Sequence, residues 1–356
     1  KMTYTKSDFQ NMLMQEGYSA FGADGSAKEY FDDQFQGLYD FSFEVADVVT
    51  LERELAYYGG NDSDGSDKNP HMMVIEACQL ADAKINFAKY DQDGDKEVDN
   101  VFVFFAGADE AEGASEDHIW SHAWYIKDGA GRNLILDGVR INRYACASEL
   151  SLMDDYITTT MTSIGTFCHE YAHTFGLPDM YDTDYQVGGL AAGTWLRTSL
   201  MDGGNYNNYG NTPPNLTAVE RDYLKLTEPG KYTIESVDKG RYFRIDSDND
   251  GEYFLIECRN ASGWDRFIGG SGMLLYHIDR SMNAAGYSDV YGRNVTALQR
   301  WGESNEVNAY ASHQCADLVE ADGRPDIFSN VEYELYLNYL ESPGGIFFPY
   351  GRVNSL

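Results

Sequence analysis

The sequence has 356 residues, 43% of them hydrophobic, which is enough for a large core and for more than one structural lobe. Its 58 acidic and 26 basic residues give a net charge of −32, which would repel a phosphate backbone and excludes nucleic acid as a partner. No run of about 18 apolar residues occurs, so no transmembrane segment is expected.

The first strong element along the chain is a helix predicted over residues 72–85. Its apolar residues step by four, three and four, which is the periodicity of one helical face. They are Val74, Cys78, Ala81 and Ile85. A nearly continuous apolar run over residues 98–107 follows, and it predicts a strand that is buried on both faces.

An acidic segment, "DQDGDKEVD", lies between this helix and this strand. It places acids in alternate positions at Asp91, Asp93, Asp95, Glu97 and Asp99. Alternate acids in a tight loop can turn several oxygens toward one hard cation, although the glycine position excludes an EF-hand. The segment predicts a structural calcium site, with four aspartate side chains and the carbonyl of Glu97 as ligands. A plain solvated turn is the alternative.

The stretch "HIWSHAWYI" (118–126) alternates in polarity and predicts a strand. His118 and His122 are four residues apart, but on a strand that separation is about 13 Å. A metal shared by the two is therefore excluded, and His122 is expected to be a buried, hydrogen-bonded histidine. The five cysteines include no close pair and are expected to be buried thiols.

Residues 156–175 return to helical spacing, with apolar residues that step by three or four. A second stripe lies beside the apolar one. It consists of Thr162, Thr166, His169 and His173. Two histidines one helical turn apart have neighbouring side chains, so both imidazoles can reach one ion.

The motif "HEYAHTFGLPD" predicts a catalytic zinc site. His169 and His173 supply two ligands, Gly176 ends the helix, and the chain can then turn so that Asp179 supplies the third. Glu170 lies about 100° around the helix from His169, which suits a general base that holds a water without binding the metal. The alternative is an ordinary helix with two solvated histidines. By chance, the H-E-x-x-H part occurs in roughly one chain of this length in a hundred.

Several stretches resemble the immune inhibitor A family of secreted metallopeptidases, relatives of the metzincins. "HEYAHTFGLPD" (169–179) is similar to the extended zinc signature of that family. The other similar stretches are "YYGGN" (57–61), "YDQDGDKEVDNVFVFFAG" (90–107), "IWSHAW" (119–124), "SLMDGGNY" (199–206), "EYFLIECR" (252–259), "SGMLLYHID" (271–279) and "LVEADG" (318–323).

The resemblance implies an α+β fold with a metzincin-like zincin catalytic domain, in which a mixed twisted sheet accompanies the active-site helix. It implies a methionine-containing turn beneath the metal, and Met201 matches that position. A tyrosine near this turn is a candidate to assist catalysis, with Tyr206 nearest and Tyr209 next. The family also implies export from the cytoplasm or display at the cell surface or in the periplasm. The expected partners of this protein are protein or peptide substrates, and the protein is expected to be a monomer. Members of the family carry a propeptide, which is not expected within this chain.

After Pro229 the pattern changes to short strand-like runs between turns. We therefore expect a catalytic domain at residues 1–227 and a β-rich, sandwich-like region at 228–356 that completes the peptidase unit. Within this region, Asp250 and Gly251 predict a hairpin.

The expected activity is that of a zinc endopeptidase with one zinc ion and at least one structural calcium ion. Glu170 would take the proton of the attacking water and pass it to the leaving amine. A calcium-stabilised binding or adhesion module that has lost catalysis is the rival interpretation, and the intact Glu170 argues against it. A zinc hydrolase acting on a non-peptide amide is a third.

Overall fold

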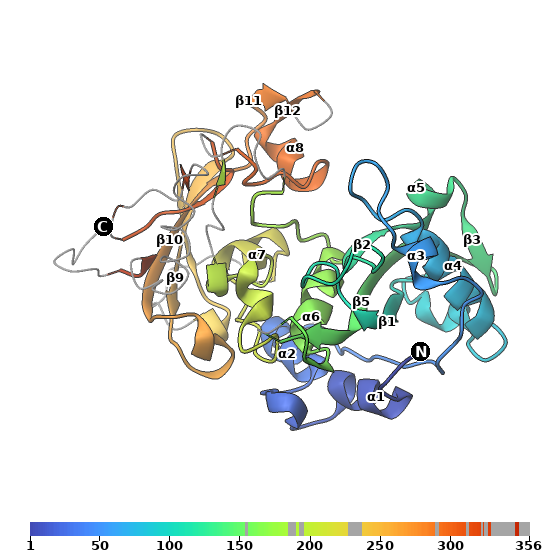
Figure 1. The fold of residues 1–356 in the computed structure, drawn as a ribbon. Helices are drawn as coiled ribbons and strands as arrows, with labels where there is room; N and C mark the ends of the chain where they lie inside the picture. Colours follow the sequence, from blue (N-terminus) through green and yellow to red (C-terminus); the bar gives the residue numbers. More distant parts are fainter. Residues whose placement is uncertain are drawn as a thin grey trace. The chain divides into compact units, whose positions relative to one another are not determined.

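The computed structural model describes residues 1–153, 156–183, 190–191, 196–226, 237–288, 292–310, 313–321, 323, 327–328 and 346–348. The chain divides into two compact units (Figure 1). The first unit comprises residues 1–29 and 41–175, and the second comprises residues 30–40 and 176–356. The boundary expected between residues 227 and 228 lies outside the described residues.

A four-stranded mixed sheet forms the centre of the first unit. Strand β5 is its middle strand, with β1 parallel to it, and with β2 and β6 antiparallel to it. The bounds are β1 (Phe102–Ala108), β2 (His122–Tyr125), β5 (Arg143–Leu152) and β6 (Thr159–Met161). A separate hairpin joins β3 (Leu134–Leu136) to β4 (Val139–Ile141). Helices and strands thus share this unit, as the sequence predicted.

The helices of the first unit are short. They are α1 (Lys6–Met14), α3 (Leu55–Tyr58), α4 (Pro70–Ala81), α5 (Ile126–Ala130), α6 (Ile164–His173) and the 3₁₀ turns η1 (Ala20–Gly22) and η2 (Phe87–Tyr90). Helix α4 confirms the helix predicted over 72–85. It begins two residues earlier because Pro70 is well suited to the first helical position, where no amide donor is needed. It ends at Ala81, before the charged segment that follows.

Two strand predictions need correction. Within β1 only Phe105 is fully buried, and the other residues are half-buried, so the strand is not enclosed on both faces. The alternating stretch 118–126 forms a strand only from His122 onward. Its first part is a turn, in which the His118 amide donates to the carbonyl of Ser115.

The helix predicted over residues 156–175 is wrong in its first half. Residues Thr159–Met161 form β6, which pairs with β5, and the helix begins only after Ser163. Three consecutive threonines precede Met161, and β-branched residues fit the edge of a sheet better than a helix. Thr162 therefore does not belong to the histidine stripe of the helix. Its amide instead donates to the carbonyl of Glu149 on β5.

The second unit contains a four-stranded antiparallel sheet in the order β13-β10-β9-β8. The bounds are β8 (Phe243–Asp246), β9 (Glu252–Arg259), β10 (Gly272–Asp279) and β13 (Ala316–Leu318). The hairpin predicted at Asp250-Gly251 joins β8 to β9. Gly251 has a φ of +87°, which only glycine adopts without strain.

Shorter elements complete the described part of the second unit. The strands are β7 (Leu190–Ala191), β11 (Ala284–Ser288), β12 (Asn294–Thr296) and β14 (Ile327–Phe328). The helices are α7 (Ala218–Tyr223), α8 (Ala297–Gly302) and the end of α2 (Ala27–Phe35), with 3₁₀ turns η3 (Leu196–Thr198), η4 (Gly203–Tyr206), η5 (Val237–Lys239) and η6 (Gly263–Phe267). Among all the described helices, none has the length and apolar character needed to cross a membrane.

Candidate metal centre

Helix α6 brings His169, Glu170 and His173 together. One ligand atom of each lies within 4.8 Å of the ligand atoms of the other two. The two imidazole rings have centroids 4.9 Å apart and are inclined by 87°. Only 6% of His169 and 7% of Glu170 are exposed, so these are not the solvated side chains of an ordinary surface helix. The helical spacing of the sequence accounts for the closeness of the two histidines.

An aromatic cluster packs against the opposite side of α6. Phe167 stacks on Tyr171, and its ring contacts those of Phe102 and Phe104 on β1. Phe43, from the segment before α3, meets both Phe167 and Tyr171 edge to face. This packing fixes the rotation of the helix about its axis and so fixes the direction in which the two histidines point.

The end of α6 is anchored as well. The guanidinium of Arg143 donates to the carbonyl of Thr174, directly after the helix. Asn100 donates from Nδ2 to Oγ1 of Thr174 at 2.5 Å. A cation at a helix C-terminus satisfies an orphan carbonyl and opposes the negative end of the helix dipole. His173, the last residue of the helix, is thereby held in a fixed turn.

The cysteines near α6 are thiols rather than additional metal ligands. All five cysteines of the chain are free, and every one except Cys258 is buried, as predicted. Burial raises the pKa of Cys168 well above its usual range. Burial also raises the pKa of Cys146 on β5, and the negative charge of Glu170 raises it further. The metal-ligand groups found within the described residues include no cysteine.

Asp179 belongs to the second unit, six residues after His173 in the chain. Gly176 between them has a φ of +95°, the left-handed conformation expected of a residue that terminates a helix. Asp179 is 6% exposed. The amide of Met180 donates to the carbonyl of Met201 at 2.8 Å, so the segment that carries Asp179 is bonded to the segment that carries Met201.

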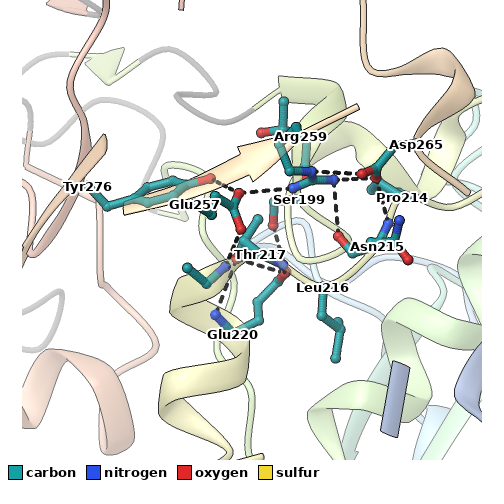
Figure 2. Close-up of polar contacts among 12 residues, drawn as sticks. Ser199, Pro214, Asn215, Leu216, Thr217, Glu220, Glu257, Arg259, Asp265 and Tyr276 are labelled. Carbon is teal, nitrogen blue, oxygen red and sulfur yellow. Dashed lines mark hydrogen bonds and ion pairs between the residues drawn. The ribbon is translucent and has the colours of Figure 1, made fainter. Parts of the chain in front are cut away.

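Met201 is fully buried, and a carboxylate holds its backbone. Glu220 of α7 accepts at Oε1 from the Met201 amide at 3.1 Å and from Oγ of Ser199 at 2.7 Å. Its Oε2 accepts from the amide and hydroxyl of Thr217. Figure 2 shows Glu220 directed at Ser199 and Thr217. Thr217 and Glu220 form a capping box, so the T-x-x-E spacing was a signal that the sequence analysis missed.

A buried ionic network supports the same region (Figure 2). Arg259 is fully buried between the carboxylates of Glu257 and Asp265. It also donates to the carbonyls of Thr198 and Asn215. Although burial alone lowers the pKa of Arg259, the two carboxylates raise it well above its usual value, so the guanidinium stays charged. Glu257, Arg259 and Asp265 lie close together in the sequence, but the carbonyls of Thr198 and Asn215 come from distant segments, so no local pattern indicates the whole network.

The two tyrosines considered for catalysis lie at the surface of the second unit. Tyr206 ends η4 and is 49% exposed, and Tyr209 is 53% exposed. Tyr209 has a φ of +55°, in the sparsely populated left-handed region.

The acidic loop brings Asp91, Asp93 and Asp95 together, with one carboxylate oxygen of each within 4.8 Å of the other two. Backbone amides in the loop turn inward, and Gly94 donates to Asp91 at 2.8 Å. Glu97 was predicted to bind through its carbonyl and Asp99 through its side chain. Glu97 forms an ion pair with Arg140, and Asp99 accepts from the amide of Gln92.

His122 is a hydrogen-bonded histidine, as predicted. Its Nε2 lies 2.9 Å from the hydroxyl of Tyr144, and its Nδ1 lies 2.7 Å from the carbonyl of Trp120. Burial lowers the pKa of His122. The metal-ligand groups found within the described residues include neither His118 nor His122.

Comparisons with known proteins identify relatives of this chain. The chain matches the model of the family described as "Immune inhibitor A peptidase M6, catalytic domain" over residues 1–233. It is 26% identical over 256 residues to Immune inhibitor A of Bacillus thuringiensis subsp. alesti, which covers 64% of this chain and 36% of that protein. It is 30% identical over 256 residues to Pre-pro-metalloprotease PrtV of Vibrio cholerae serotype O1, covering 64% of this chain and 27% of the relative.

The match therefore spans 36% of the length of the Bacillus relative and 27% of the length of the Vibrio relative. The family match covers more than half of the chain and includes α6 with its His-Glu-His group. Because the family match covers well over half of the chain, this chain belongs to the immune inhibitor A peptidase M6 family.

Proposed function

We propose that this chain is a zinc-dependent endopeptidase with a metzincin-like catalytic domain. The observation that carries the proposal is the group formed by His169, Glu170 and His173, whose ligand atoms lie within 4.8 Å of one another on one buried helix. Membership of a peptidase family supports the reaction class.

The donors present suit zinc. Imidazole nitrogen and carboxylate oxygen are typical ligands of catalytic zinc, and three protein ligands leave one position open for reaction. His169 and His173 supply two of the three donors. We assign Asp179 as the third, because only five residues separate it from His173 and the left-handed Gly176 permits a sharp change of direction between them.

Zinc bound there would supply a Lewis acid that polarises the scissile carbonyl and acidifies water. Glu170 then performs the proton transfers. One carboxylate oxygen accepts the proton of the attacking water, and the same group delivers it to the nitrogen of the leaving amine. Because Glu170 is almost fully buried, its carboxylate interacts with the reacting atoms at a lower dielectric constant than in bulk water.

We propose that residues Ser199–Met201 form the methionine turn of this domain. The buried Met201, its bond to Met180 and its support from Glu220 are consistent with a rigid turn. Tyr206, five residues further along, is our candidate to stabilise the developing oxyanion. Tyr206 is 49% exposed, and a phenolic hydroxyl is a suitable hydrogen-bond donor to an oxyanion.

We further propose a structural calcium site at Asp91, Asp93 and Asp95, with Asp99 and the carbonyl of Glu97 completing it. Burial raises the pKa of Asp99, and the charges of Asp93, Asp91 and Asp95 raise it further. A divalent cation would remove this repulsion.

The proposed setting is outside the cytoplasm, with protein or peptide substrates and a monomeric enzyme. The Vibrio relative is named a pre-pro-metalloprotease, which denotes a leader and a propeptide in that protein. We retain the proposed division into a catalytic domain at 1–227 and a β-rich region at 228–356 that completes the peptidase unit. Free calcium is abundant outside cells, which fits the proposed loop site.

The test is Glu170→Gln. The variant should retain zinc at about one ion per chain but lose casein cleavage, because the amide cannot accept the proton. Glu116→Gln, which changes an exposed carboxylate of the same unit, should cleave at the wild-type rate. Cleavage by Glu170→Gln at the wild-type rate would refute the mechanism. Zinc binding by the wild type without cleavage of any peptide would favour a binding module or a hydrolase of non-peptide amides.

A further inference from the structure

Two segments far apart in the sequence are tied together at Asp179. The amide of Asp179 donates to Oδ1 of Asn305 at 2.7 Å, and Nδ2 of Asn305 donates back to Oδ2 of Asp179 at 2.7 Å. Thr183 donates from Oγ1 to the carbonyl of Asn305, and Asn308 donates from Nδ2 to the carbonyl of Met180, each at 2.7 Å. Residues 305–308 thus hold both the backbone and the carboxylate of the segment 179–183.

The two bonds between Asn305 and Asp179 define the orientation of both side chains. If the Asn305 amide were flipped, its NH₂ group would face the Asp179 amide, donor against donor, so the pair fixes which atom is oxygen. Asn305 has a φ of +53°, a conformation that asparagine tolerates better than most residues. The backbone at this position is therefore shaped to present the amide to Asp179.

We propose that Asn305 is a positioning residue for the metal ligand Asp179. The inference rests on the proposed function, in which Asp179 is the third zinc ligand. Partners that hydrogen-bond a ligating carboxylate hold it in the orientation that the metal needs, and their loss commonly weakens metal binding 10- to 100-fold. Asn305 fixes the carboxylate at Oδ2 and the backbone at the amide, so the ligand is ordered before the ion arrives.

The sharpest variant is Asn305→Asp. It keeps the shape of the side chain and an oxygen that accepts from the Asp179 amide. However, it replaces the Nδ2 donor with a carboxylate oxygen that faces Oδ2 of Asp179 and repels it. Zinc affinity, measured by competition with a chromophoric chelator, should fall about 10- to 100-fold. Chemical unfolding in the presence of chelator would report any loss of stability that does not depend on the metal.

Two variants act as controls. Asn249→Asp adds the same charge in the exposed β8–β9 hairpin of the same unit, and it should leave zinc affinity unchanged. Asn305→Gly allows the left-handed backbone but removes both bonds without adding charge. It should lower zinc affinity severalfold, and it tests the inference if Asn305→Asp does not fold.

Asp179→Asn separates the inference from the function on which it rests. If Asp179→Asn weakens zinc binding while Asn305→Asp and Asn305→Gly do not, the ligand assignment stands and the role of Asn305 is refuted. If Asp179→Asn binds zinc as tightly as the wild type, the ligand assignment fails and the inference fails with it. The double variant Asp179→Asn with Asn305→Asp should lose no more zinc affinity than Asp179→Asn alone. This result would support the inference, because it would show that Asn305 acts through the Asp179 carboxylate.

Discussion

Helix α6 and the segment around Met201 are held in place in opposite ways. Helix α6 aligns His169 and His173 by its own periodicity, and neighbouring strands only fix its rotation. The Met201 segment has no regular structure of its own to align it, and Glu220 and Arg259 hold it from 19 and 61 residues away in the chain. The arrangement of α6 can be predicted from neighbouring residues in the sequence, whereas that of the Met201 segment depends on the completed fold.

The largest expected effect tests helix α6, whose histidines are aligned by local structure. His173→Ala should remove zinc and reduce peptide cleavage by about 10³-fold or more, since several kcal/mol of transition-state stabilisation are lost. The fold should persist, because the aromatic cluster that anchors α6 is untouched. Zinc content and casein hydrolysis are the measurements, and His118→Ala is the matched control. Retained zinc and activity in His173→Ala would contradict the site.

The next largest effect tests the Met201 segment, which is held by residues distant in the chain. Arg259→Ala should lower the free energy of unfolding by about 3–5 kcal/mol, because it leaves Glu257 and Asp265 buried without their cation. Arg244→Ala, which breaks an exposed ion pair with Asp246, should cost no more than about 1 kcal/mol. Denaturant unfolding would measure both. Equal effects of the two variants would mean that the buried network does not support this unit.

Calcium binding tests a second motif that is local in the sequence, the acidic loop with Asp91, Asp93 and Asp95. At a calcium concentration of 100 times the dissociation constant, the wild-type chain should gain about 2.7 kcal/mol of stability relative to chelator-treated protein. Asp93→Asn should remove most of this gain, since it deletes one charged oxygen from the group. Calorimetric titration with calcium and thermal unfolding would test this. An unchanged unfolding temperature with added calcium would indicate a solvated turn.

The smallest effect concerns a non-local contact within the first unit. Burial raises the pKa of Glu112 to about 7, and its carboxylate accepts from the amide of Leu152 at 2.8 Å. Between about pH 4.5 and 7 the folded chain holds a proton that the unfolded chain has lost. The contribution of Glu112 to stability is therefore complete below about pH 4.5 and is lost as the pH rises through about 7.

Glu112→Gln should abolish this dependence, because glutamine keeps an acceptor for Leu152 but cannot ionise. The rise in the pKa of Glu112 from 4.5 to about 7 sets an upper limit of about 3 kcal/mol on this effect. Because the side chain is only half-buried and solvent screens its charge, the variant should gain about 1–2 kcal/mol relative to the wild type between pH 4 and pH 8. Unfolding curves recorded across this range would measure the difference. Parallel pH profiles for the two proteins would show that Glu112 does not titrate in this way.

Local patterns in the sequence predicted helix α4, the β8–β9 hairpin and the His-Glu-His group, because each depends on residues within a few positions of one another. The first half of the helix predicted over 156–175 is wrong for the complementary reason. The pairing of Thr159–Met161 with β5 is a tertiary contact that outweighs the apolar periodicity of the segment.

The sequence by itself determined that His169 and His173 lie side by side, since two histidines one turn apart on a helix must share a face. Only the tertiary structure brought Glu220 to Met201, and Asn305 to Asp179 across 126 positions. The physical reason is that helical geometry is set by the backbone. A buried carboxylate instead takes whichever donors the fold brings to it.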